Sequence, residues 1–131
     1  MKKFVLLSAL LCGQVFAQIS LDNEIISLPN GIKIEKLNKT QKVASFVNGN
    51  ISVSYKGTLK NGTEFDSSND QRVNFNLNNL IPCWKDAIPK LNVGETAKIT
   101  CPSETAYGSR PLPSIPANSD LIFEIKLFSA N

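Results

Sequence analysis

Side chains that commonly perform chemistry are few in this sequence, and histidine is absent from all 131 residues. That absence excludes a Ser-His-Asp triad and any metal site with a histidine ligand. The candidates that remain are Asp66 with the two serines after it, the tyrosines Tyr55 and Tyr107, and the cysteines Cys83 and Cys101. Two cysteines alone do not make a zinc site. We expect neither a metal nor a cofactor, and composition alone does not reveal an activity.

Asp66 and Tyr107 each allow two interpretations. An aspartate followed by two serines is typical of a capped turn, and Tyr107 next to a glycine is compatible with an exposed loop hydroxyl. Both residues could instead stand at the rim of a binding pocket. The same choice between core and pocket wall applies to the large aromatic residues Phe65, Trp84 and Phe123.

The first seventeen residues differ from the rest of the chain. Two lysines precede an almost wholly apolar run at residues 4–12, and Val15-Phe16-Ala17 follows where a signal peptidase would cleave. This pattern predicts a cleaved secretory signal peptide at residues 1–17, because the run is too short to span a bilayer comfortably. An uncleaved anchor and lipid attachment at Cys12 are less favoured alternatives. We expect a periplasmic or secreted protein with no stable membrane insertion after cleavage.

The charge of the mature chain is close to zero. Loss of residues 1–17 would leave 12 basic and 11 acidic residues. The lysines are scattered along the chain and form no cluster. Composition therefore gives no electrostatic basis for binding to nucleic acid.

Cys83 and Cys101 are the only cysteines that would remain after signal cleavage. In an oxidising compartment paired cysteines tend to be bridged, and two cysteines allow one pairing. We predict a disulfide between them, with Cα atoms within about 7 Å of each other. Two buried free thiols are the alternative, because cysteine packs well in cores.

The mature chain is expected to be rich in strands. Alternation of apolar and polar residues predicts five of them, and Asn61-Gly62 predicts a tight turn after the second. The one helical candidate spans residues 83–91, where apolar residues recur with helical spacing and Pro89 limits the length. The strands are expected at residues 32–37, 51–59, 73–77, 97–101 and 121–128.

These elements predict an α+β fold. A helix must bury its apolar stripe, and a sheet must bury one face. The simplest arrangement is a curved antiparallel β-sheet wrapped around one short α-helix. No internal repeat or second domain is visible in the sequence. We expect a leader at residues 18–31 and a single domain at residues 32–131.

Seven short segments resemble the FKBP-type peptidyl-prolyl cis-trans isomerases, in the family's order and nearly its spacing. Together they cover roughly residues 30–128, and the ordered set is highly specific. The layout of leader and domain is most similar to small exported bacterial members. The segments are Tyr55-Lys56-Gly57-Thr58-Leu59, Asn61-Gly62, Glu64-Phe65-Asp66-Ser67-Ser68, Leu80-Ile81-Pro82-Cys83-Trp84, Ala106-Tyr107-Gly108, Ile115-Pro116-Ala117-Asn118 and Leu121-Ile122-Phe123-Glu124-Ile125-Lys126-Leu127.

The resemblance implies an apolar ligand pocket with Trp84 as its floor. Tyr107 would point its hydroxyl into the mouth, Asp66 would sit at the rim, and the backbone N–H of Ile81 would bind a ligand carbonyl. Phe75, by contrast, is expected to be an ordinary core residue. The implied catalytic residues are Tyr55, Phe65, Asp66, Trp84, Tyr107 and Phe123. The implied substrate-binding residues are Val73, Leu80, Ile81 and Ile115.

The resemblance also implies the reaction, which is rotation about Xaa-Pro bonds in proline-containing polypeptides. Amide resonance sets a barrier of about 18–20 kcal/mol, and rotation makes or breaks no bond. The planar amide is strongly dipolar and the twisted transition state is less so. An apolar, aromatic pocket therefore favours the twisted form, which is differential binding of the transition state. The absence of histidine is no obstacle to such a mechanism.

We expect a monomeric enzyme that assists the folding of exported proteins and that binds macrolides such as rapamycin, as the resemblance implies. One alternative is a binding module or holdase chaperone that keeps the FKBP fold with little turnover. A β-rich adhesion or inhibitor domain is a further alternative, which the ordered motifs disfavour.

Overall fold

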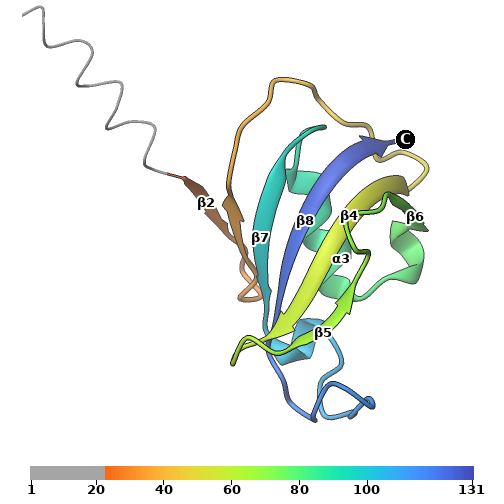
Figure 1. Ribbon diagram of the computed structural model, residues 1–131. Coiled ribbons are helices and arrows are strands. Elements are labelled where there is room, and N and C mark those ends of the chain that lie inside the picture. The colour runs from red at the N-terminus through yellow and green to blue at the C-terminus, as the bar shows by residue number, and fades with distance from the viewer. Residues whose placement is uncertain (1–22) are drawn as a thin grey trace, which may run out of the picture.

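A single antiparallel sheet organises residues 23–131, the part of the chain that the computed structural model describes (Figure 1). The expected signal peptide at residues 1–17 lies outside these described residues. The sheet has seven strands in the order β2-β3-β7-β8-β4-β5, and β6 also pairs with β4. The strands are β2 (Glu24–Ser27), β3 (Lys33–Lys36), β4 (Asn50–Leu59), β5 (Glu64–Ser67), β6 (Val73–Asn76), β7 (Thr96–Cys101) and β8 (Leu121–Ala130).

The helix α3 (Pro82–Ala87) lies behind the sheet in Figure 1 and buries its apolar side there. In β8 the side chains of Leu121, Phe123, Ile125 and Leu127 are buried, and the acidic and basic residues between them face solvent. The same alternation buries one face of β7. Because one face of the sheet is apolar, it packs against the helix and forms the core. The predicted curved antiparallel sheet around one short helix is confirmed.

The helix is shorter than its apolar pattern predicts. Pro82 occupies its first turn, where a missing N–H costs no hydrogen bond. The α-helix ends at Ala87, and residues Ile88–Lys90 form the 3₁₀ turn η2. Pro89 explains the change, since it has no N–H to donate to the carbonyl four residues earlier.

Two strands were not expected from the sequence: β5, and β2, whose residues the sequence assigned to the leader. Glu24–Ser27 pairs antiparallel with Lys33–Lys36 at the edge of the sheet. Most of its side chains are exposed, so Glu-Ile-Ile-Ser lacks the alternation that marks a half-buried strand. Its pairing with β3 creates the strand, and this part of the expected leader belongs to the sheet.

A long segment without regular structure connects β3 to β4 and arches over one end of the sheet (Figure 1). Its anchor is the fully buried Glu95, which accepts hydrogen bonds from the backbone N–H groups of Asn92 (2.9 Å) and Thr40 (3.1 Å). The ammonium group of Lys36 lies 3.0 Å from the same carboxylate. Burial alone would raise the pKa of Glu95, but these donors outweigh it and lower the pKa below its ordinary value.

Candidate active site

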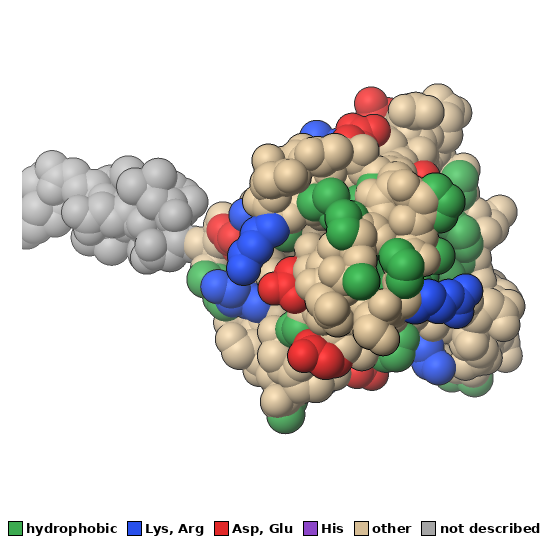
Figure 2. All heavy atoms as spheres, turned by 90° about the horizontal axis from the view of Figure 1, so that it is seen from below, with side chains coloured by type: hydrophobic (Ala, Val, Ile, Leu, Met, Phe, Trp, Pro, Cys, Tyr) green, Lys and Arg blue, Asp and Glu red, His purple; other side chains and the backbone are tan. Residues whose placement is uncertain are grey.

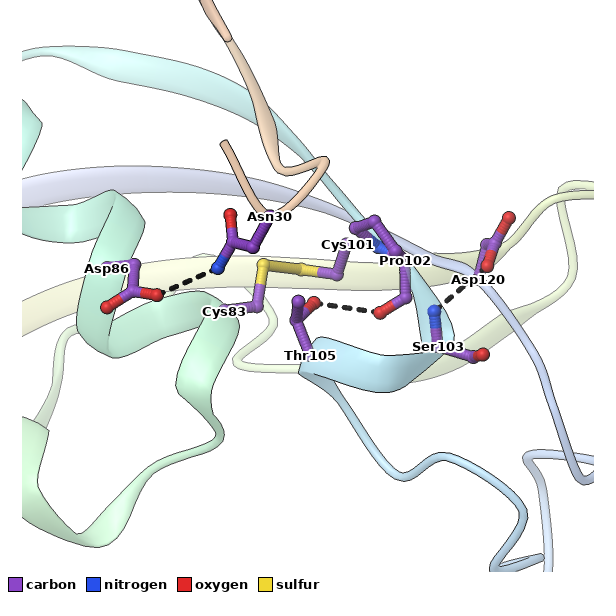
Figure 3. The surroundings of a disulfide bond; sticks show 8 residues. All are labelled: Asn30, Cys83, Asp86, Cys101, Pro102, Ser103, Thr105 and Asp120. Carbon is purple, nitrogen blue, oxygen red and sulfur yellow. Dashed lines mark hydrogen bonds between the residues drawn. A yellow bond between two sulfur atoms is a disulfide. The ribbon is translucent and has the colours of Figure 1, made fainter. Parts of the chain in front are cut away.

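A disulfide joins Cys83, in the first turn of α3, to Cys101, the last residue of β7 (Figure 3). Their Cα atoms are 5.8 Å apart, and both side chains are fully buried. The predicted disulfide is therefore confirmed. It ties the start of the helix to the strand that leads into the loop at residues 103–120.

Hydrogen bonds around the disulfide hold the beginning and the end of that loop (Figure 3). The N–H of Ser103 donates to Asp120 at 2.9 Å, which closes the base of the loop. The hydroxyl of Thr105 donates to the carbonyl of Pro102 at 2.8 Å, within the turn η3 (Ser103–Thr105). The loop thus starts from a fixed frame that includes the helix.

A cavity of about 510 Å³ opens between the sheet, α3 and this loop. The segments that form it are far apart in sequence, and the antiparallel sheet together with the disulfide brings them to one end of the molecule. Its walls are largely aromatic and aliphatic, with a few polar side chains at the mouth. The lining residues are Tyr55, Phe65, Asp66, Phe75, Asn79, Leu80, Ile81, Trp84, Ala106, Tyr107, Arg110 and Phe123.

Trp84 is the centre of the aromatic wall. Its ring meets those of Phe123, Tyr55 and Phe75 edge to face, with centroids 5.2, 5.4 and 5.8 Å away. Phe65 continues the wall from Phe123 at 5.6 Å. Edge-to-face pairs at these distances add to the energy of burial. The buried indole Nε1 donates no hydrogen bond within residues 23–131, so packing alone holds the ring.

Gly57 makes room for two of these rings. A Cβ atom at this position would lie 2.6 Å from Cζ of Phe65 and 2.9 Å from Cε1 of Phe123. No side chain fits there unless both rings move. This glycine is therefore a steric requirement of the cavity wall, a role that the sequence motif alone does not reveal.

The polar rim on one side is the pair Tyr55 and Asp66. The Tyr55 hydroxyl donates to Oδ2 of Asp66 at 2.8 Å, and Oδ1 accepts the N–H of Ser67 at 2.8 Å. Burial, followed by the hydrogen bond to Asp66, raises the pKa of Tyr55 to about 12. Asp66 lies in β5 and lines the cavity, whereas Oγ of Ser67 accepts the N–H of Asn69 in the turn that follows.

Two hydrogen-bond donors on residues that line the cavity have no acceptor within residues 23–131. The carbonyl of Ile81 accepts the N–H groups of Trp84 and Lys85 at the start of α3, but the N–H of Ile81 donates to no protein group. The Tyr107 hydroxyl likewise has no partner. Both donors belong to residues that line the cavity.

The structure brings eight of the ten expected pocket residues around this cavity and leaves Val73 and Ile115 outside its lining. Val73 lies on β6 opposite Val53 and packs against the core. Ile115 is 5% exposed and is part of the core itself. Ile115 packs as a buried residue of the core and Val73 as a half-buried residue against it, and their assignment to the pocket wall stays a prediction.

The lining also includes residues that the sequence did not predict. Phe75, expected to be a core residue, forms part of the wall beside Trp84 and Tyr55. Alternation assigns it to a buried face but does not distinguish a core from a cavity wall. The other unexpected residues are Asn79, Ala106 and Arg110.

Fold and site together define a protein with an open, aromatic cavity for an apolar group and with hydrogen-bond donors at its mouth. No three histidine, cysteine, aspartate or glutamate side chains in the described part of the chain gather as a metal site. Nor is any helix there long and apolar enough to cross a membrane.

The family is shown by a match to the FKBP-type peptidyl-prolyl cis-trans isomerase domain over residues 41–128. This chain therefore belongs to that family and is a peptidyl-prolyl cis-trans isomerase by class. Among curated proteins it is 38% identical to FK506-binding protein 1 of Candida glabrata, over 80% of this chain and 97% of that protein. It is 44% identical to FkpA of Buchnera aphidicola, over 59% of this chain and 32% of that one.

Solved structures agree with this assignment. A peptidyl-prolyl cis-trans isomerase from Pseudomonas syringae pv. tomato superposes with a TM-score of 0.75 at 27% identity, over 98% of both chains. FkpA from Escherichia coli gives a TM-score of 0.74 at 28% identity, over 88% of this chain and 55% of that one.

Proposed function

We propose that the aromatic cavity is the catalytic site for Xaa-Pro isomerisation and that the natural substrates are polypeptides folding after export. The observation that carries the first part is the combination of apolar walls with two unpartnered donors at the mouth. A prolyl ring would occupy the cavity above Trp84, and the flanking chain would reach Ile81 and Tyr107.

The proposed mechanism needs no proton transfer. The planar amide is stabilised by resonance that places charge on its oxygen, and the twisted transition state loses much of that dipole. Walls made of aromatic rings solvate the planar form poorly, so they disfavour it relative to the twisted form. Every 1.4 kcal/mol of such preferential binding is worth about tenfold in rate.

The two donors would hold the peptide on either side of the rotating bond. The N–H of Ile81 is fixed by the start of α3 and would donate a hydrogen bond to a substrate carbonyl. The Tyr107 hydroxyl would bind a second carbonyl from the opposite rim. The rigid Tyr55–Asp66 pair would limit how the peptide lies across the mouth, since its hydrogen bond is already formed.

We propose that the protein acts in the periplasm or outside the cell. Support comes from the signal-peptide pattern at residues 1–17 and from the disulfide, because stable disulfides are typical of oxidising compartments. We also propose that the chain acts as a monomer and that the cavity binds macrolides such as rapamycin and FK506. The relative in Candida glabrata is named for FK506 binding.

The test is to compare activity and stability in Tyr107→Phe and Asp66→Ala. Both changes remove polar atoms at the rim and leave the aromatic wall in place. We expect kcat/KM for a Leu-Pro peptide to fall by more than the stability change explains, and rapamycin to block the wild-type activity. Full activity in both variants would mean that the rim is wrongly assigned. Trp84→Ala serves as the comparison, because it should lose stability by about 3–5 kcal/mol as well as activity.

A further inference from the structure

Arg110 is the cation of the cavity, and its guanidinium group has no protein partner. Asp66 and Arg110 are the two charged residues that line the cavity. Within residues 23–131 the guanidinium of Arg110 takes part in no ion pair or hydrogen bond. Asp66 forms no ion pair with it, and the two Asp66 oxygens accept hydrogen bonds from Tyr55 and Ser67. The exposed guanidinium is therefore free to bind an anion at the mouth.

The backbone that carries Arg110 is held in place. Its N–H donates to the carbonyl of Tyr107 at 3.0 Å, so both side chains come from one turn. The N–H of Asn118 donates to the carbonyl of Gly108 at 2.7 Å and closes the loop across this turn. Pro111 follows directly and restricts the backbone of Arg110. A fixed backbone reduces the entropy that the side chain loses when it binds a ligand.

The charged side chains around Arg110 do not create a general positive potential that would add to its own charge. Figure 2 views the end of the molecule where the loop at residues 103–120 lies, and exposed hydrophobic side chains there stand among both acidic and basic ones. Attraction of an anion to the mouth would therefore depend on Arg110 itself. A guanidinium suits a carboxylate well, because its planar fork can donate two parallel hydrogen bonds.

We infer that Arg110 is a specificity-determining residue that favours proline peptides with an acidic side chain next to the proline. The inference rests on the proposed function, since it places the substrate chain across this mouth. The ion pair would be exposed to solvent, which limits its contribution. The expected preference for a glutamate over a glutamine next to the proline is therefore about two- to fivefold in kcat/KM.

The experiment compares two peptides that differ only in Glu or Gln before the proline, and a second pair with the change after it. Glutamine has the shape of glutamate without the charge. The ratio of kcat/KM within a pair is measured for wild type, Arg110→Gln, Arg110→Lys and Lys98→Gln. Lys98 is an exposed cation on the opposite face of the sheet, so its variant loses the same charge elsewhere.

We expect the Glu/Gln ratio in at least one pair to fall about two- to fivefold in Arg110→Gln, to fall less in Arg110→Lys and to stay unchanged in Lys98→Gln. High salt should abolish the difference, because the screening length is only about 3 Å at 1 M. Equal ratios in wild type and Arg110→Gln for both pairs would overturn the inference. So would an equal loss in Lys98→Gln, which would show a general charge effect.

Binding gives a readout that does not need turnover. The chain has one tryptophan, Trp84, and it lies in the cavity wall, so its fluorescence can report peptide binding. Absence of turnover on every peptide would contradict the proposed function alone. The ratio of the Glu and Gln dissociation constants, in wild type and Arg110→Gln, would still decide the role of Arg110.

Discussion

Gly57→Ala offers a sharp test of how the cavity wall is built. The added Cβ would lie 2.6 Å from Cζ of Phe65 and 2.9 Å from Cε1 of Phe123. Carbon atoms pack at about 3.5–4.0 Å, so the Phe65 ring must move by about 1 Å. Overpacking of this kind costs about 1–3 kcal/mol, whereas the replacement of glycine by alanine in a strand stabilises the fold by about 0.5–1 kcal/mol. The free energy of unfolding should fall by roughly 0–2.5 kcal/mol.

Activity should respond more strongly than stability. The rings that move belong to the cavity wall, and a misplacement of 1 Å can cost about 100-fold in rate. We expect kcat/KM for a Leu-Pro peptide to fall at least about tenfold, measured beside urea unfolding of the same variant. Gly62→Ala is the matched control, because no atom lies within 4 Å of its added Cβ and its positive φ of 94° makes the change costly for backbone reasons only.

A double-mutant cycle tests the cause. Phe65→Leu removes the Cζ atom that the new Cβ would approach, so Gly57→Ala should destabilise this background less than the wild type. Strict additivity of the two changes would refute the proposed clash. Full activity in a folded Gly57→Ala variant would refute the link between the wall and catalysis.

Three further predictions concern stability. Reduction of the Cys83–Cys101 bond, which spans 18 residues in sequence, should lower the free energy of unfolding by about 3 kcal/mol in urea titrations, and an unchanged midpoint would contradict this. The lowered pKa of Glu95 stabilises the fold above its ordinary value of 4.5, and this stability is lost as pH falls through the lowered value. Glu95→Gln should therefore weaken the acid dependence of unfolding; an identical dependence would count against the buried contact. The raised pKa of Tyr55 gives stability that is complete below pH 10 and is lost as pH rises towards 12. Ultraviolet titration should lose a transition near pH 12 in Tyr55→Phe, and a wild-type protein without that transition would exclude the shift.

The sequence predicted the sheet because its buried strands alternate clearly. Residues 121–128, for example, place every second side chain in the core, and the structure has β8 there. Patterns could not predict β2, whose four residues form a strand only through their pairing with β3. The length of the α-helix was overestimated because the apolar spacing continues past Pro89 while the helical hydrogen bonding does not.

The site was predictable through ordered motifs more than through chemistry. Trp84 and Tyr107 belong to recognisable segments, and they meet at one cavity. Phe75 lines the cavity although it was expected in the core, because alternation reports burial and not what a buried side chain faces. Arg110 gave no signal, since a single arginine in a polar loop is ordinary until its neighbours in space are known.

In the proposed mechanism the cavity accelerates amide rotation without proton transfer. The most direct test of this mechanism is the pH dependence of kcat/KM for an uncharged Leu-Pro peptide, followed by exchange NMR from pH 6 to 9. We expect clear acceleration over buffer and a flat profile, because the chain has no histidine and the mechanism moves no proton. A bell-shaped profile would contradict the proposed mechanism, and no acceleration at micromolar protein would contradict catalysis itself.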